Sequence, residues 1–383
     1  MRPNHAKRVG VAVAVSFVLS LLVSYVDHRR HPFSDLSGGD KTDHIAHMHM
    51  ARLFPRLGFA VYRVPLERLL TSLDDEARRQ LPVDERVAAS DHGRDVYEVP
   101  GARPAYVSWS ALPRPYPPGD MLAFAPVAAL YEWTPLPFAL ANWMLVVSCL
   151  IYAHVGLFLL WQAIHDDWDA SPLVRWGICL LVAVPILRFA LDGFYDVVMI
   201  PPLFLSARWL HEGKWSRAAM AFSFAFFLHY RALFFAPYAI LALVHACRSP
   251  NDWGSRDVFS LLMTCLLGGI ASYTLFLVQP WLHAFPLTNP VNLAGRHFGA
   301  SIGYVAFALF IVLAFWRVDA RLDAAISVTL FALLISVRQV QAWHIIALIP
   351  WIAAPTSRGA RSPWPARIIR GAATAFVYLV LVS

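Results

Sequence analysis

Long apolar runs separated by short polar segments extend through most of the chain. The first run covers residues 9–26 and stops at four charged or ionisable residues, 27–30. Because no small-x-small cleavage site comes before these residues, we expect an uncleaved first span with its N-terminus in the cytoplasm. Later runs predict spans at about 138–164, 173–190, 196–211, 218–247, 257–279, 300–317, 322–337, 343–355 and 371–383. The run 218–247 is either one long tilted helix or two half-helices.

A long polar segment, residues 27–119, follows the first span, and we expect it to form a large extracytoplasmic loop. The apolar stretch after it, 120–133, is short for a span and contains Pro126, which favours an interfacial or re-entrant helix.

Two segments of this loop have helical patterns. Residues 45–57 predict a helix that Thr42 or Asp43 could cap. Mixed charges at helical spacing in 66–94 predict an amphipathic helix lying on the membrane surface. The expected fold is therefore an all-α polytopic membrane protein with about ten or eleven transmembrane helices in a single domain. It divides into a first span (9–26), a loop with juxtamembrane helices (27–137) and the remaining spans (138–383).

Composition supports a bilayer environment. Of the 383 residues, 58% are hydrophobic and 15% are charged, whereas soluble domains are usually about 45–50% apolar and about 25% charged. The four cysteines lie inside apolar runs without paired spacing, which favours small hydrophobic packing over a disulfide or zinc framework.

The net charge of +7 is distributed between the apolar runs instead of forming one stripe, which disfavours nucleic-acid binding. The positive-inside rule for membrane proteins explains the distribution of basic residues better. If 218–247 passes twice, the basic loops share the cytoplasmic side with the N-terminus, and the polar clusters fall on the opposite side. These loops contain Arg208, Lys214 and Arg217; Arg248 and Arg256; Arg317 and Arg321; and Arg358, Arg361, Arg367 and Arg370.

Several ionisable residues fall at or near membrane depth, where each costs about 2.5–3.5 kcal/mol on insertion scales. They are Arg188, His229, Arg231, Arg338 and His344. Each could reach an interface or pair within the bundle, or they could line a wet functional cavity. Asp35, Asp40 and Asp43 follow the first span closely, within reach of a lipid head group; capping and solvation are the alternatives to a catalytic role.

Short motifs in order along the chain resemble the GT-C integral-membrane glycosyltransferases. The similarity is greatest to the GPI mannosyltransferase I type and to bacterial polyprenol-phosphate-mannose-dependent enzymes of the family 87 type. The segments that carry it are 43–52, 58–63, 116–118, 192–196, 229–231 with 236–237, and 336–344 with Pro350. Two positions depart from the pattern: Lys41 stands where close relatives have the first acid of a pair, and His344 replaces a tyrosine. The resemblance therefore does not fix the metal or the sugar.

The resemblance implies a hexosyltransferase, mannose-like, in the plasma membrane of a bacterium. Its donor would be a polyprenyl-phosphate-linked sugar, and its acceptor a hydroxyl of a lipid-linked or cell-envelope glycan on the extracytoplasmic face. Asp43 is the expected general base, giving inversion. Arg231 is the first and Arg338 the second candidate to bind the donor phosphate, because a guanidinium matches phosphate oxygens. His229 and His344 are possible supporting donors. Expected substrate contacts are Tyr116, Asp192, Asp196, Tyr230, His297, Gln341 and Trp343, and a divalent metal ion is a possible cofactor.

Two other functions remain open from the sequence. One is a transporter or flippase of a lipid-linked sugar, which the lack of an internal repeat disfavours. The other is a different envelope transferase, of the O-antigen ligase or acyltransferase type. A ligase would carry its large outer loop late in the chain, whereas here it comes first.

Overall fold

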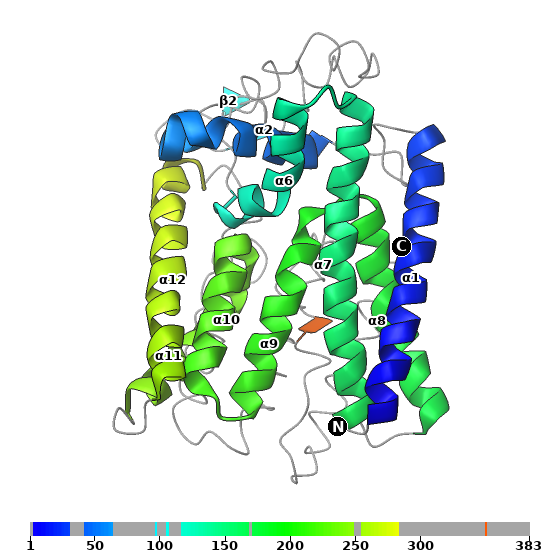
Figure 1. Ribbon diagram of the computed structural model, residues 1–383. Coiled ribbons are helices and arrows are strands. Elements are labelled where there is room, and N and C mark those ends of the chain that lie inside the picture. The colour runs from blue at the N-terminus through cyan, green and yellow to red at the C-terminus, as the bar shows by residue number, and fades with distance from the viewer. Residues whose placement is uncertain are drawn as a thin grey trace.

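The computed structural model describes residues 3–30, 42–63, 96–97, 105–106, 116–167, 171–248, 254–282 and 349–350 (Figure 1). Predictions for spans beyond 282 and for the amphipathic helix at 66–94 lie outside these residues.

Helices form nearly all of the described segments. In chain order the elements are α1 (Pro3–Arg30), α2 (Thr42–Leu57), η1 (Gly58–Arg63), β1 (Val96–Tyr97), β2 (Ala105–Tyr106), α6 (Gly119–Trp133), α7 (Phe138–Asp167), α8 (Pro172–Leu191), η3 (Tyr195–Met199), α9 (Ile200–His211), α10 (Trp215–Leu228), η4 (Tyr230–Phe235), α11 (Ala236–Arg248) and α12 (Ser255–Leu282). The two strands pair antiparallel, with Val96 opposite Tyr106, and are the one exception in these segments to the predicted all-α class.

Four helices of the described part are long and apolar enough to cross a membrane: α1, α7, α8 and α12. The outer faces of α1 and α12 expose large apolar side chains, among them Leu22, Leu262 and Phe276. An aqueous surface would not tolerate faces of this kind, whereas lipid would. The chain is therefore an α-helical membrane protein.

Two predicted spans, 196–211 and 218–247, differ from the structure because the three helices they correspond to are short. Helix α9 has 12 residues, α10 has 14 and α11 has 13, or about 18 to 21 Å at 1.5 Å per residue. The hydrocarbon core is about 30 Å thick, so none of these helices crosses it alone. The run 218–247 is two half-helices, because His229 adopts an extended conformation after α10 and interrupts the helix.

Prolines and glycines mark most helix boundaries. Helix α2 ends at Leu57, and the next residue, Gly58, has a φ of 54°, a left-handed conformation that only glycine adopts easily. Pro172 occupies the first turn of α8, where its missing N–H costs nothing, and the Ser171 hydroxyl caps the helix at Val174. These local signals agree with the predicted boundaries of the long helices.

The helices pack side by side in a bundle (Figure 1). Helix α7 contacts α1, α8 and α9, whereas α10 contacts α9, α11 and α12. Helix α2 lies across one end of the bundle, packed on α6, and α10 with α11 forms a hairpin that opens at the other end. The predicted interfacial or re-entrant helix at 120–133 corresponds to the 15-residue α6.

The N-terminal end of α1 lies at the same end of the bundle as the α9–α10 and α11–α12 connections (Figure 1). Lys214 lies in the first of these connections, and Arg208, Arg248 and Arg256 lie at the helix ends beside them. These basic residues therefore gather at the end of the bundle where α1 begins, the arrangement that the loop charges predict. The other end holds α2, α6 and the elements that build the candidate site.

Candidate functional site

Four parts of the chain that are distant in sequence meet at the end of the bundle that α2 covers. They are α2 itself, the start of α6, η3, and the end of α10 with the beginning of η4. They contribute the residues that we call the polar cluster: His47, Tyr116, Asp120, Tyr195, Asp196 and His229. All except Tyr116 are buried, so this is a polar interior within an apolar bundle.

The first histidine–acid pair of the polar cluster joins α2 to α6. His47 Nδ1 contacts Asp120 Oδ2 directly, and both side chains are 0% exposed. Asp120 lies in the first turn of α6, where the helix dipole and the exposed amide groups favour a carboxylate. The fold thus gives the buried Asp120 carboxylate a histidine partner. A buried carboxylate without a hydrogen-bonding partner would cost free energy.

The second pair joins η3 to the end of α10. His229 Nε2 lies 3.3 Å from Asp196 Oδ1, and each side chain is 5% exposed. His229 occupies this position because α10 ends there with an extended residue.

Two tyrosine rings connect the pairs. The Tyr116 ring lies edge-on to the rings of His47, at 4.7 Å between centroids, and of His229, at 5.3 Å. The Tyr195 ring lies 4.8 Å from His47 and stacks on His229 at 5.9 Å. The two histidines therefore share the same pair of aromatic neighbours and form one site.

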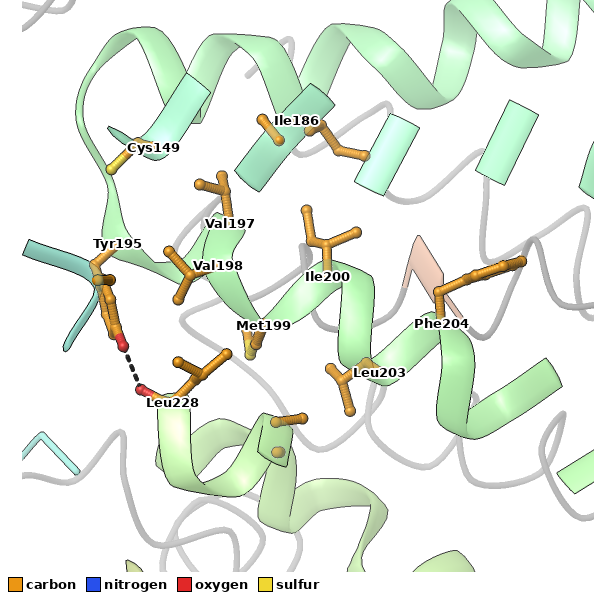
Figure 2. Close-up of a cluster of buried hydrophobic side chains, with 14 of the residues drawn as sticks. Cys149, Ile186, Tyr195, Val197, Val198, Met199, Ile200, Leu203, Phe204 and Leu228 are labelled. Atoms are coloured by element: carbon orange, nitrogen blue, oxygen red, sulfur yellow. Dashed lines mark hydrogen bonds between the residues drawn. The ribbon is translucent and has the colours of Figure 1, made fainter. Parts of the chain in front are cut away.

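Hydrogen bonds fix the aromatic residues on the surrounding helices. Tyr195 Oη donates to the carbonyl oxygen of Leu228 at 2.7 Å, at the end of α10 (Figure 2). Behind it, Val197, Val198 and Met199 are packed into the apolar core (Figure 2). Tyr230 Oη donates to Thr274 Oγ1 of α12 at 2.9 Å. The rings of η3 and η4 therefore have defined positions.

Close packing between α6 and α10 holds the Asp120 backbone. A Cβ atom at Gly119 would lie 2.5 Å from the Phe227 carbonyl oxygen and 2.8 Å from the Leu228 Cα. Contacts this short do not occur, so only glycine allows the two helix ends to approach so closely.

Tyr62 of η1 is a further polar group beside the polar cluster. Its side chain is fully buried, and its Oη has no hydrogen-bond partner among the described residues. Burial, followed by the negative charge of Asp120, raises the pKa of the Tyr62 hydroxyl well above its usual value. The phenol therefore stays neutral at physiological pH.

The structure brings three of the predicted site residues together: Tyr116, Asp196 and His229. Tyr230 follows His229 directly, and Asp192 is buried at the C-terminal end of α8. Asp43 lies in the first turn of α2 and Arg231 in η4; their side chains are outside the described part. The other predicted residues, His297, Arg338, Gln341, Trp343 and His344, also lie outside the described residues.

Sequence reasoning missed His47, Asp120, Tyr195 and Tyr62. His47 follows Asp43 by four residues, which places both on the same face of α2. Asp120 closes the Tyr-Pro-Pro-Gly-Asp segment, and Tyr195 lies within the segment 192–196. His47, Tyr62 and Tyr195 were inside motifs already noted, and Asp120 begins the apolar stretch 120–133, but no local pattern indicated that these segments meet.

In the described ranges, no three His, Cys, Asp or Glu side chains converge as a metal site would need. The possible metal ion therefore gains no ligand set from the polar cluster.

Comparisons of the chain with protein-family models, curated proteins and solved structures gave no match. What the fold and the site define is an α-helical membrane protein with a buried histidine, carboxylate and tyrosine cluster at one end of its bundle.

Proposed function

We propose that the protein is a GT-C-like glycosyltransferase that uses a polyprenyl-phosphate-linked hexose, mannose-like, as donor. One observation supports this most. Four of the segments that resemble the family, 43–52, 116–118, 192–196 and 229–231, contribute His47, Tyr116, Tyr195, Asp196 and His229, which lie together in the polar cluster. Their convergence on one buried site supports a shared role for these segments.

The chemistry has three requirements. The site must hold a lipid phosphate at the interface, accept a proton from the acceptor hydroxyl and stabilise the departing phosphate. In the proposal, the Asp43 carboxylate accepts the proton while the acceptor oxygen forms a bond to the anomeric carbon. The bond from that carbon to the phosphate oxygen breaks, and polyprenyl phosphate leaves with the electron pair. Attack from the face opposite the phosphate gives inversion.

Phosphate stabilisation is assigned to Arg231, with Arg338 second and His229 and His344 as supporting donors. A planar guanidinium offers paired donors that match phosphate oxygens. This assignment needs no metal, so treatment with EDTA is expected to leave the transfer rate unchanged. A rate that falls with EDTA and returns with Mg²⁺ or Mn²⁺ would instead assign the phosphate to a metal.

The acceptor is proposed to be a hydroxyl of a lipid-linked or cell-envelope glycan. Tyr116, Asp192, Asp196 and Tyr230, with His297, Gln341 and Trp343, are the proposed contacts for sugar or isoprenoid. The site is proposed to face the extracytoplasmic side of a bacterial plasma membrane. Cysteines introduced at positions 43, 193 and 290 should then react with an impermeant maleimide from outside, and a cysteine at position 214 from inside.

A second candidate function is transport of a lipid-linked sugar. The observation that favours it is the α10–η4–α11 hairpin, because interrupted helices at membrane depth often form transporter binding sites. Against it stands the large polar segment between the first two long spans, which a transporter does not need.

Reconstitution separates these candidates. Purified protein in liposomes is given polyprenyl-phosphate-[¹⁴C]mannose and envelope lipids, and the products are analysed by mass spectrometry. We expect the label to appear on an acceptor lipid or glycan in the liposomes. The same product should be missing from the envelope of cells that lack active protein. Label that only moves between leaflets, without a new glycosidic bond, would support the transporter and reject the transferase.

A further inference from the structure

The contact between His47 and Asp120 joins two helices that also pack on each other. Helix α2 lies across the bundle end, whereas α6 runs into the bundle (Figure 1). The two residues are 73 positions apart in sequence, and both side chains are 0% exposed. Buried polar pairs of this kind are best known for fixing one arrangement of neighbouring helices.

A second link between the same helices is of a different kind. Arg52 and Arg56 of α2 both reach Glu132 of α6, at 2.6 and 2.8 Å. These groups are partly or largely exposed, with 71% of the Arg56 side chain accessible. Exposed ion pairs contribute little, so of these two polar links the buried pair adds more to the positional control that the apolar packing of α2 already gives.

The Asp120 side of the buried pair is fixed. Gly119 packs against the end of α10 with no room for a side chain, and the Asp120 amide donates to the Pro117 carbonyl oxygen at 3.2 Å. The His47 ring contacts the rings of Tyr116 and Tyr195, which also contact each other and His229. His47 is thus held from three directions, and α2 is held with it.

Asp43 lies one helical turn before His47 on α2. Because an α-helix rises 5.4 Å per turn and is stiff over this length, the position of His47 determines the position of the Asp43 backbone. We propose that His47 and Asp120 are positioning residues, and that their contact sets the first turn of α2, with Asp43, against the wall formed by Tyr116, Tyr195 and His229. This inference deepens the proposed function and rests on it for its kinetic consequences.

The kinetic test uses three variants. His47→Ala is expected to lower kcat by about a hundredfold, the size of effect that a small misplacement of a reacting group causes, with the KM for the donor unchanged. Asp120→Asn keeps an oxygen that accepts the His47 N–H, so it should retain kcat within a fewfold. The matched control Glu132→Ala, which removes the exposed link between the same helices, should keep wild-type kinetics.

A spectroscopic test does not depend on activity. Cys247 and Cys265, the exposed native cysteines, are replaced by alanine, and spin labels are placed at positions 42 and 214. Wild type, Asp120→Asn and Glu132→Ala should give one narrow distance distribution, whereas His47→Ala should give a broad or displaced one.

The two tests separate failure of this inference from failure of the proposed function. If wild-type protein transfers no sugar but His47→Ala broadens the distance, the proposed function fails and the positioning role stands. An unchanged distance in His47→Ala, or wild-type kcat in that variant, overturns the positioning role. Equal inactivity of Asp120→Asn and His47→Ala also overturns it, because the charge of Asp120 would then matter and not the geometry.

Discussion

The Tyr195 hydroxyl donates a hydrogen bond to the carbonyl oxygen of Leu228, 33 residues later, at 2.7 Å (Figure 2). Leu228 is the last residue of α10, and the carbonyls of a final helical turn lack partners within the helix. The bond therefore satisfies an orphan acceptor inside the bundle and connects η3 to the point where α10 stops. It also fixes the ring that lies between His47 and His229.

Removing only this hydroxyl should destabilise the protein. Tyr195→Phe keeps the ring but leaves a buried carbonyl without its donor, a loss of about 1–3 kcal/mol. We expect a lower Tm in detergent, measured with a thiol-reactive dye. Tyr25→Phe is the control, because the Tyr25 side chain is 48% exposed and phenylalanine keeps its ring contact with Trp143; an equal effect of the two changes would contradict the assigned role of Tyr195.

Two glycines provide a matched test of the packing between α6 and α10. Gly119→Ala introduces a Cβ that would overlap the Phe227 carbonyl oxygen, so the helix ends must separate, at a cost of about 1–3 kcal/mol. Gly177→Ala in α8 meets no atom within 4 Å and should be neutral or stabilising by up to about 1 kcal/mol through helix propensity.

Thermal unfolding and sugar transfer should be measured for both glycine variants. Gly119→Ala should lose stability and also activity, since Asp120 follows it directly. A Gly119→Ala protein as stable as Gly177→Ala would show that the close approach of α6 and α10 is not needed.

A hydrogen bond within the membrane joins α1 to α7. Ser16 Oγ lies 3.1 Å from His154 Nε2, while His154 Nδ1 bonds to the Leu150 carbonyl oxygen at 2.7 Å. Interhelical hydrogen bonds in membranes average about 0.6 kcal/mol, so a double-mutant cycle of Ser16→Ala and His154→Phe should give a coupling of about that size. Ser148→Ala, whose hydroxyl bonds within its own helix to Met144, should show no coupling to His154→Phe.

The sequence was sufficient to predict the long helices, because their signal is local. An apolar run bounded by charge or by proline and glycine predicts a helix wherever the chain is placed, and α1, α7, α8 and α12 follow it. The shortness of α9 to α11 was not predictable in the same way. Their residues are as apolar as those of a span, and the break between α10 and α11 lies at His229, whose extended conformation ends α10.

The polar cluster shows the same division between local and long-range information. Tyr116, Asp196 and His229 were predicted individually, because a polar or aromatic residue in an apolar run is conspicuous. The pairing of His47 with Asp120 spans the polar segment after the first span, and no periodicity relates one side of that segment to the other. A partner for His47 could be found only from the folded structure.

Asp43→Asn tests the proposed general base directly. The amide cannot accept a proton from the acceptor hydroxyl, so the transfer rate should fall by about 10² to 10⁴, whereas the protein should still insert and fold. Asp166→Asn is the control, since Asp166 is an exposed acid at the other end of α7. Initial rates at saturating donor measure the effect. Full activity of Asp43→Asn would remove Asp43 as the base.

Arg231→Ala tests the binding of the donor phosphate. Hydrogen bonds to charged groups contribute about 1.5–3 kcal/mol, so the apparent affinity for polyprenyl-phosphate-sugar should fall about tenfold to a hundredfold. Because the leaving phosphate gains charge as the bond to the sugar breaks, kcat should fall as well.

Arg231→Lys should recover part of the affinity, because lysine supplies a point charge but not the paired geometry of the guanidinium. Arg248→Ala, at the far end of α11, is the control. Donor titrations of the three variants decide the question: if the KM of Arg231→Ala equals that of Arg248→Ala, another cation binds the phosphate, and Arg338 is the next to be tested.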